Sequence, residues 1–144
     1  MRTNVNDAKV RAIARDVYRS LGSGYSETVY DHAMQVGLRL EKIRYQGQKV
    51  VELKYKEHYV GEGYPDLVVG SGADTIVVEL KAVKGELGPS EEQQLRNYMK
   101  ILKVRRGLLI NFQQPGTKLR ENARETEPEP EIIEVLNEEN RSAR

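Results

Sequence analysis

Two short apolar runs, separated by a segment rich in glycine, constrain the fold of this chain more than any other feature. The first run begins at Pro65-Asp66, and the second ends in Glu79-Leu80-Lys81. Between them, Gly70-Ser71-Gly72-Ala73-Asp74 has the composition of a turn. An antiparallel hairpin would place the start of the first strand opposite the end of the second. The sequence therefore predicts that Asp66 and Glu79 are neighbours, although thirteen positions separate them.

Side chains alternate along a strand, so Val77, Glu79 and Lys81 should share one face of the sheet. Two carboxylates and one ammonium at a sheet end would suit a divalent cation bound beside a phosphodiester. The alternative is a solvated strand face, because 31% of the residues are charged and Glu-x-Lys is a common pattern. Residues 51–54 repeat the tetrapeptide of residues 78–81 without a Pro-Asp opening, and we interpret that copy as an ordinary strand.

Apolar residues at helical spacing predict two helices before these runs. The first should cover about residues 7–21, with Asn6 as its N-cap. The second should begin at Glu27 after the cap Ser26, with Tyr30 near its start and away from its buried stripe. That predicted stripe consists of Val29, Ala33, Val36, Leu40 and Ile43.

The remaining elements follow from alternation and capping patterns. Residues of about 48–56 and 58–63 read as a hairpin that joins the two apolar runs in a meander of three or four strands. A capping box at residues 90–93 predicts a third helix ending near Lys103. Residues 107–112 predict a short buried strand, parallel to a neighbour because a helix precedes it. The order ααβββαβ indicates an α/β fold in which helices flank a mixed sheet of four to five strands.

Composition limits the chemistry that is available. The chain has no cysteine and two histidines, His32 and His58, so any metal must be held mainly by oxygen. Oxygen ligands favour Mg²⁺ or Mn²⁺ over zinc. Mean hydropathy is −0.66, and no apolar run approaches the roughly eighteen residues of a membrane span. We expect a soluble, cytoplasmic protein without membrane contact.

Charge divides the chain unevenly. Residues 121–144 carry eight glutamates and three arginines, a net charge of −5, so residues 1–120 carry +6 of the overall +1. We expect one domain over residues 1–120 and an acidic, Pro/Glu-rich tail over 121–144, with residues 132–136 as one short helix or strand that docks. The basic body suits a polyanion. The tail could compete with that polyanion or bind a protein partner, or it could simply be solvated.

Several segments resemble the PD-(D/E)XK nuclease superfamily, of the RecB type, and more narrowly the proteins named for a GxxExxY motif. The likeness extends over about residues 6–112 and implies a restriction-endonuclease-like core. In the order of the family, the matching segments are Gly24-Tyr25-Ser26-Glu27-Thr28-Val29-Tyr30, then residues 64–69, 77–83, 94–98 and 107–112. After Asn111-Phe112 the chain has Gln113-Gln114, where relatives tend to have glycine.

The resemblance implies a role for each matching residue. Asp66 and Glu79 would be metal ligands and Lys81 the cation near the attacking water, and we add the Leu80 carbonyl as a further ligand. Glu27 would be an additional catalytic carboxylate that helps to hold a second metal. Alternatively, its charge would only interact favourably with the positive end of the helix dipole. Gln94 and Tyr98 match an element that positions the strand being cut, although Tyr98 also fits a core position. Tyr30 would assist positioning or pack beneath the site.

These roles predict a nuclease dependent on Mg²⁺ or Mn²⁺ that hydrolyses phosphodiester bonds, in DNA rather than RNA. A second reading is a catalytically weak or silent module that binds nucleic acid or a protein partner on the same fold. A third is a structural adaptor that works through the acidic tail. A homodimer would suit paired cuts.

Overall fold

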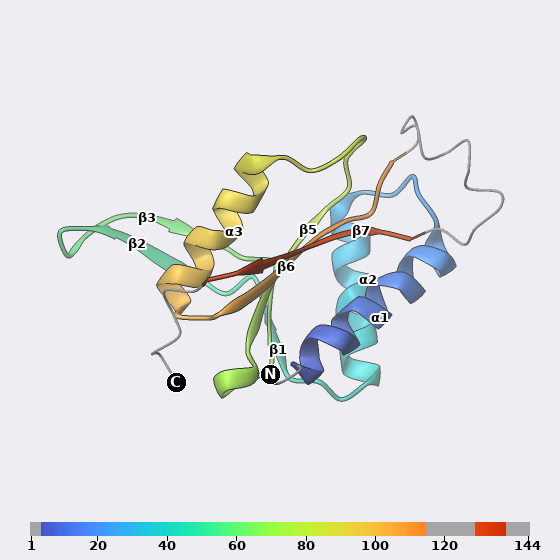
Figure 1. Cartoon of the computed structure of the whole chain (residues 1–144), viewed down its shortest axis with the longest axis horizontal. Coiled ribbons are helices and arrows are strands. Elements are labelled where there is room, and N and C mark those ends of the chain that lie inside the picture. Colours follow the sequence, from blue (N-terminus) through green and yellow to red (C-terminus); the bar gives the residue numbers. More distant parts are fainter. Residues whose placement is uncertain (1–3, 115–128, 138–144) are drawn as a thin grey trace.

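The computed structural model describes residues 4–114 and 129–137 (Figure 1). Within them lie three α-helices, α1 (Val5–Leu21), α2 (Glu27–Leu40) and α3 (Pro89–Leu102). The strands are β1 (Tyr45–Gly47), β2 (Val51–Tyr55), β3 (His58–Gly63), β4 (Leu67–Val69), β5 (Ile76–Lys81), β6 (Arg106–Asn111) and β7 (Glu131–Leu136). A single 3₁₀ turn, Gly72–Asp74, joins β4 to β5. No described helix combines the length and the apolar character needed to cross a bilayer.

Five strands form one mixed sheet in the order β1-β4-β5-β6-β7. β5 and β6 run parallel, and every other neighbouring pair is antiparallel. Helices α1 and α2 cover one face of this sheet and α3 covers the other (Figure 1). The predicted mixed α/β architecture is confirmed, as is the parallel placement of the strand after the third helix.

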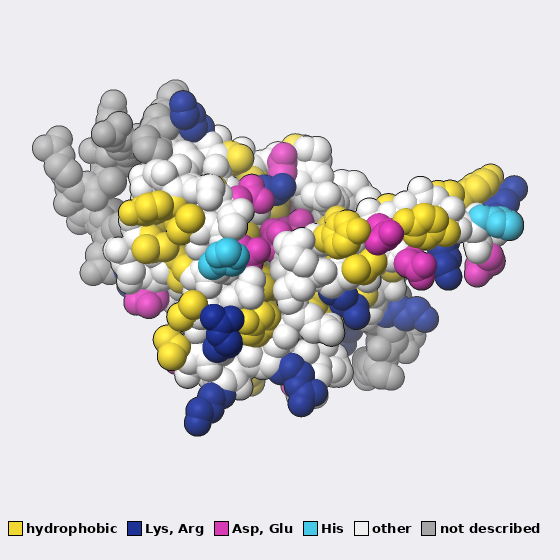
Figure 2. Space-filling model, turned by 180° about the vertical axis from the view of Figure 1, so that it is seen from behind, with side chains coloured by type: hydrophobic (Ala, Val, Ile, Leu, Met, Phe, Trp, Pro, Cys, Tyr) yellow, Lys and Arg dark blue, Asp and Glu magenta, His cyan; other side chains and the backbone are white. Residues whose placement is uncertain are grey.

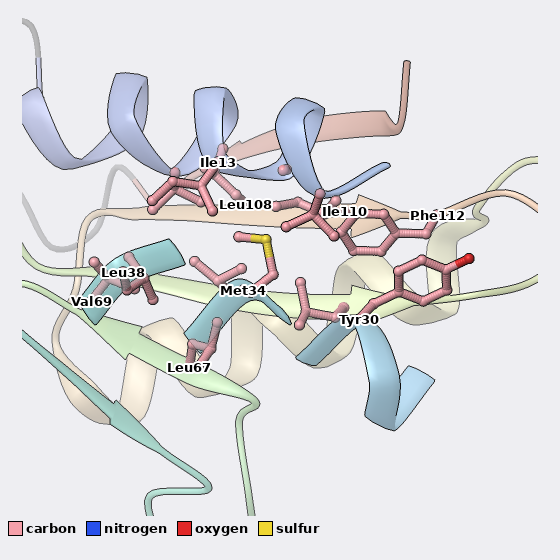
Figure 3. Packing of buried hydrophobic residues seen from close by; sticks show 14 of the residues in the cluster. Ile13, Tyr30, Met34, Leu38, Leu67, Val69, Leu108, Ile110 and Phe112 are labelled. Atoms are coloured by element: carbon pink, nitrogen blue, oxygen red, sulfur yellow. The ribbon is translucent and has the colours of Figure 1, made fainter. Parts of the chain in front are cut away.

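Strand alternation divides the core into two layers. Ile76, Val78 and Leu80 pack beneath α1 and α2, in the larger cluster drawn in Figure 3. Val77 points to the opposite face and packs against Leu95 of α3. Because Glu79 and Lys81 follow Val77 at every second position, they belong to the face covered by α3. The alternation predicted for β5 is therefore present in the structure.

Helix α1 begins two residues earlier than predicted. The N-cap is Asn4, whose side chain accepts a hydrogen bond of 3.1 Å from the backbone N–H of Asp7. Asn6, the predicted cap, instead donates from Nδ2 to the carbonyl of Asp74 at 2.9 Å. Both asparagines satisfy the local capping pattern. Nδ2 of Asn4 also lies 3.5 Å from the carbonyl of Asp74, so both side chains contact the turn before β5. Asn4 is the one that accepts the capping hydrogen bond, and the prediction of Asn6 was wrong.

The buried stripe of α2 also differs from the prediction. Tyr30, Met34 and Leu38 are fully buried, whereas Val36 is 45% and Leu40 76% exposed. The ring of Tyr30 stacks on Phe112 at a centroid distance of 4.4 Å (Figure 3). Gly37 meets α1 so closely that a Cβ there would lie 2.5 Å from Cγ2 of Ile13. These two tertiary contacts set the rotation of the helix about its axis, which periodicity alone left open.

The predicted meander is wrong in one respect. β2 and β3 pair only with each other, in a separate two-stranded sheet that projects from the body and is called the arm below (Figure 1). The edge of β4 is occupied by β1, a strand that the sequence analysis did not predict. Because β1 provides the hydrogen bonds along this edge, β3 cannot continue the main sheet.

Strand β7 comes from the segment that was assigned to the acidic tail. It pairs with β6, with Ile133 opposite Leu109, and Val135 is fully buried. The apolar residues of this segment therefore form the edge strand of the main sheet. Of the two structures expected for this docking element, a short helix or a strand, the strand is the one observed. Residues 115–128 and 138–144 lie outside the described part of the chain, so the domain boundary at residue 120 stays a prediction.

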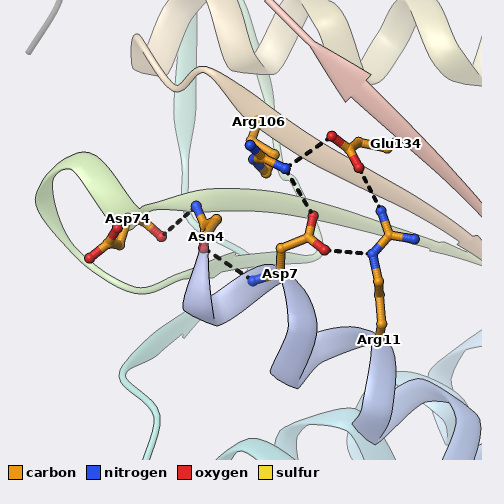
Figure 4. Close-up of polar contacts among 6 residues, drawn as sticks. All are labelled: Asn4, Asp7, Arg11, Asp74, Arg106 and Glu134. Atoms are coloured by element: carbon orange, nitrogen blue, oxygen red, sulfur yellow. Dashed lines mark hydrogen bonds and ion pairs between the residues drawn. The ribbon is translucent and has the colours of Figure 1, made fainter. Parts of the chain in front are cut away.

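Ion pairs connect α1 to strands β6 and β7 (Figure 4). Oδ1 of Asp7 lies 2.5 Å from Nε of Arg11, and Oδ2 lies 3.6 Å from Nη1 of Arg106. Glu134 of β7 contacts both arginines, at 2.8 Å and 3.0 Å. Two carboxylates and two guanidinium groups thus alternate across the joint between the first helix and the edge strand.

Candidate active site

The ends of β4 and β5 bring Asp66 and Glu79 together. Leu67 pairs with Val78 in the antiparallel ladder, so Asp66 and Glu79 come next to each other at its end. The N–H of Asp66 donates to Oε1 of Glu79 at 2.7 Å, and the N–H of Leu80 donates to Oδ2 of Asp66 at 2.7 Å. Each carboxylate is therefore fixed by the backbone of the other strand. The predicted proximity of the two carboxylates is present.

Burial makes this pair of carboxyl groups difficult to ionise. Loss of solvent raises the pKa of Asp66 to about 6, and the charges of Asp31 and Glu27 also raise it, against the Leu80 hydrogen bond. Loss of solvent, followed by the charge of Asp66, raises the pKa of Glu79 to about 8. Two neighbouring carboxylates in a site of low polarity repel each other. Near neutral pH, the pair therefore retains a proton unless a cation compensates its charge.

Lys81 supplies positive charge at the same place. It ends β5 on the face of Glu79 and is partly exposed. Its charge lowers the pKa of both Asp66 and Glu79, against the larger effect of burial. It also lowers the pKa of Glu91 on α3, after the stronger effect of the Gly88 N–H. The ammonium group thus acts on both the carboxylate pair and the start of α3.

Helix α2 adds two acidic side chains. Glu27, in its first turn, is exposed, and its charge raises the pKa of Asp66 and of Glu79. Asp31, one turn later, affects the pKa of Asp66 more than Glu27 does, and its Oδ1 accepts a hydrogen bond of 2.9 Å from Gln35. The sequence analysis missed Asp31. Its spacing of four residues from Glu27, which places both on one helical face, is the signal that would have indicated it.

The GxxExxY segment owes its shape to contacts with the end of β6. Gly24 has a φ of +106°, and its N–H donates to Oε1 of Gln114 at 3.1 Å. The hydroxyl of Tyr30 donates to the carbonyl of Gly22 at 2.6 Å. Tyr30 is fully buried, so in this structure it positions the loop before Glu27 and has no surface to offer a substrate. The packing option for Tyr30 is the one that the structure supports.

The two residues of α3 that were predicted to position the substrate, Gln94 and Tyr98, lie in different environments. Gln94 is exposed, whereas Tyr98 is 8% exposed and belongs to the core beneath α3. A Cβ on Gly63 would lie 2.5 Å from Cε1 of Tyr98, so this glycine lets the end of β3 pass close to the ring. Tyr98 therefore packs the base of the arm against α3. Gln94 remains available to solvent one turn earlier.

A polar cluster missed by the sequence analysis fixes the segment between Lys81 and α3. Asn111 is fully buried, and its Oδ1 accepts from the N–H of Val83 at 3.0 Å. Its Nδ2 donates to the carbonyl of Gly85 at 3.1 Å and to Oε1 of Glu131 at 3.2 Å. Glu131 also accepts from the N–H of Leu87 at 3.2 Å. Residues of β6 and β7 thus determine the path by which β5 leads into α3.

Gln113 and Gln114, where relatives tend to have glycine, have defined positions. The carbonyl of Gln113 accepts a hydrogen bond of 2.6 Å from the hydroxyl of Tyr18, and its Nε2 donates to Gly85 at 3.3 Å. The N–H of Gln114 donates to Val83 at 3.2 Å. This departure from the family pattern therefore ties the exit of β6 to α1 and to the segment after Lys81.

The donors at this site suit a hard cation. Within the described residues, no group of three or more His, Cys, Asp or Glu side chains is arranged to hold a metal. Two carboxylates and a backbone carbonyl nevertheless match Mg²⁺, which usually keeps several waters and binds substrate phosphate. Oε1 of Glu79 and Oδ2 of Asp66 accept backbone hydrogen bonds, and Oδ1 of Asp66 accepts a long hydrogen bond of 3.4 Å from Nε2 of Gln48. Oε2 of Glu79 and this weakly bound Oδ1 of Asp66 are therefore the oxygens left for a cation. A bound cation would also remove the repulsion that raises both pKa values.

Comparisons with known proteins concern the family and the fold of the chain. The search of curated proteins found no match. The solved structure titled "Crystal structure of SSO0001" superposes with a TM-score of 0.52 at 16% identity, covering 95% of this chain and 69% of the other. That likeness supports the fold. The family model described as the PD-(D/E)XK nuclease superfamily matches residues 5–124. With the paired carboxylates at the ends of β4 and β5, this match shows that the chain belongs to the PD-(D/E)XK nuclease superfamily.

Proposed function

We propose that this chain is a nuclease that uses Mg²⁺ or Mn²⁺ to hydrolyse phosphodiester bonds in DNA. The observation that carries the proposal is the reciprocal attachment of Asp66 and Glu79 to the opposite strand, with Lys81 on the same face. A purely structural pair of buried carboxylates would be costly, because repulsion and desolvation oppose its ionisation. Preorganised cation ligands explain why that cost is tolerated.

In this proposal, Asp66, Glu79 and the Leu80 carbonyl hold the cation. When bound, the cation neutralises charge on the scissile phosphate and acidifies a water molecule. Lys81 places a further positive charge where negative charge develops on the reacting phosphate. The charges of the exposed Glu27 and of Asp31 act on Asp66, and in this proposal these two side chains would orient water or hold a second cation. Gln94, exposed on α3, is the residue suited to contact the strand being cut.

DNA is proposed as the substrate from charge and from the family. Residues 1–120 carry a net charge of +6, which favours association with a polyanion, although the three glutamates of residues 129–137, the segment that contains β7, offset half of it. This attraction does not separate DNA from RNA. The test must therefore include both polymers.

The decisive experiment incubates the full chain with single-stranded, duplex and branched DNA and with RNA, in Mg²⁺, Mn²⁺ or EDTA. Glu79→Gln and Lys81→Ala should each lower turnover by at least about 100-fold, the range lost with one electrostatic group in an active site. Glu52→Gln is the matched control, because residues 51–54 repeat residues 78–81 in the arm, and its turnover should equal that of the native chain.

The outcomes of this experiment distinguish the alternative functions of the chain. Cleavage that survives Glu79→Gln or persists in EDTA would place the activity in another centre or in a contaminant. Binding of nucleic acid without any turnover would identify a binding module on a nuclease fold. Cleavage of RNA in preference to DNA would correct the proposed substrate.

A further inference from the structure

The arm formed by β2 and β3 carries aromatic surface that the fold does not use. Tyr59 is 56% exposed and Tyr64, at the base of the arm, is 48% exposed. Tyr64 is followed directly by Pro65 and Asp66, so the arm leads into the carboxylate pair. Figure 2 shows acidic side chains gathered near the middle of one face, with hydrophobic side chains continuing from them onto the arm.

Tyr59 and Tyr64 lie on one face of the arm. Both hydroxyls donate to the carboxylate of Glu62, at 2.6 Å and 2.9 Å. This shared acceptor raises the pKa of Tyr59 to about 12, so its hydroxyl remains a neutral donor. With their hydroxyls held by the same carboxylate, the two rings have restricted orientations. Fixed rings with free faces are suited to stacking, since little conformational freedom is lost on binding.

A third tyrosine of the arm lies on its other face. Tyr55 pairs with His58, whereas the preceding residue, Lys54, pairs with Tyr59. The side chains of paired residues point to the same face of a sheet, and those of successive residues point to alternate faces. The Tyr55 side chain therefore lies on the other face of the arm from Tyr59. Tyr55 is 63% exposed, and Nζ of Lys56 lies 5.3 Å from its ring centroid. The arm therefore contains its own control: a tyrosine of similar exposure outside the Tyr59–Tyr64 pair.

Charge indicates which part of a nucleic acid the arm would contact. Residues 49–64 contain three lysines and three glutamates, so the arm carries no net charge with which to attract a phosphate backbone. Aromatic rings instead stack on bases, and they do so with little regard to sequence. Bases in a duplex are already stacked on each other, whereas those of a single strand are free.

We propose that Tyr59 and Tyr64 stack on bases of a single-stranded segment adjoining the phosphodiester at the carboxylate pair. This inference rests on the proposed function and names its substrate class: DNA with a single-stranded portion next to the cleavage point. The arm holds that portion by its bases, while the basic body holds the backbone. Binding through the arm is therefore less sensitive to salt than binding through the body.

The test measures binding of a short fluorescent single strand and of a duplex of the same sequence to the full chain, in EDTA so that neither is cleaved. Tyr59→Ala should weaken single-strand binding by about 5- to 100-fold, the range expected for one stacked base. Tyr59→Phe, which keeps the ring, should stay within about threefold of the native chain. Tyr55→Ala should leave affinity unchanged, and none of these variants should alter duplex binding.

Because no metal is present, this measurement is independent of nuclease activity. An equal loss for single strand and duplex, an equal loss for Tyr55→Ala, or no loss would each overturn the role of the arm without affecting the proposed nuclease. Failure of the native chain to bind single strands would do the same. A native dimer that Tyr59→Ala converts to a monomer, with unchanged DNA binding, would assign the arm to a second copy instead. The expected binding in EDTA, combined with no cleavage by the native chain in Mg²⁺ or Mn²⁺, would overturn the nuclease proposal alone.

Discussion

Asn111 and Glu131 lie opposite each other in the β6–β7 ladder, and their side chains are joined by a hydrogen bond of 3.2 Å. Both residues also bind backbone groups of the segment that follows Lys81. A strand from the acidic part of the sequence therefore helps to hold the exit of the strand that carries Glu79. The edge of the sheet and the candidate active site are parts of one hydrogen-bonded structure.

Asn111→Ala should both destabilise the chain and slow catalysis. The substitution removes the hydrogen bonds of the fully buried Asn111 amide and leaves the part-buried N–H of Val83 without its side-chain acceptor, which costs about 1–3 kcal/mol. The segment between Lys81 and α3 then loses its fixed path, so kcat should fall more than KM rises. Urea unfolding and steady-state kinetics measure the two effects. Glu131→Gln keeps an acceptor oxygen and should have a smaller effect; a larger effect than that of Asn111→Ala would contradict this account.

Stability without metal should decrease as the pH rises. The pKa of Glu79 is about 8 and that of Asp66 about 6 in the folded chain, both above their ordinary values, so the folded state binds more protons than the unfolded state. This contribution is fully present below about pH 4 and is lost as the pH rises to about 8. Between pH 5 and 8, the associated fall in Tm should be about 3–8 °C in EDTA.

Glu79→Gln should remove most of this pH dependence, because glutamine cannot ionise. Added Mg²⁺ should raise Tm more at pH 8 than at pH 5, since the cation binds the ionised carboxylates. Thermal unfolding at a series of pH values, with and without Mg²⁺, measures both effects. An unchanged slope in Glu79→Gln would show that other groups dominate the titration.

Gly37→Ala should destabilise the chain even though alanine is the better helix former. The added Cβ would lie 2.5 Å from Cγ2 of Ile13, so α1 and α2 would have to move apart. We expect a net loss of about 1–3 kcal/mol, typical of overpacking. Ile13→Ala supplies the missing space, so the double variant should lose less than the sum of the two single variants. Strict additivity in urea unfolding would rule out this contact as the cause.

Arg106→Met should cost about 1–3 kcal/mol, because the buried Oδ2 of Asp7 loses its nearest guanidinium group while Oδ1 keeps its ion pair with Arg11. Replacing Asp7 by Asn in the same chain removes the negative charge and should recover part of that loss. Arg96→Met is the control, since the contacts of Arg96 with Glu92 and with the carbonyl of Leu136 are both exposed and their loss should cost about 1 kcal/mol or less. Equal losses for the two arginines in urea unfolding would show that the Asp7 carboxylate finds compensation elsewhere.

Local sequence determined the elements that carry the candidate chemistry. The Pro-Asp opening and the glycine turn were sufficient to predict that Asp66 and Glu79 meet. The alternation of side chains between the two faces of β5 was sufficient to predict that Lys81 shares the face of Glu79. These predictions rest on strand geometry, in which the period of two leaves few choices. The mixed α/β architecture followed in the same way from the order of the helical and strand patterns.

Tertiary contacts decided the features for which local sequence patterns allow more than one arrangement. The side of α2 that faces the core depends on Tyr30 meeting Phe112 and on Gly37 meeting Ile13, contacts between distant segments. Pairing of β1 with β4 excluded β3 from the main sheet and left the arm as a separate hairpin.

The same reason explains the residues that the sequence analysis missed or placed outside the domain. The charge of Asp31 influences the pKa of Asp66, and β7 pairs with β6, only because the chain folds back on itself. Hydrogen bonds within one helix or hairpin are encoded by neighbouring residues, whereas the pairing of distant segments depends on which surfaces remain free once the sheet is built. The sequence by itself determined the carboxylate pair, and only the tertiary structure decided what surrounds it.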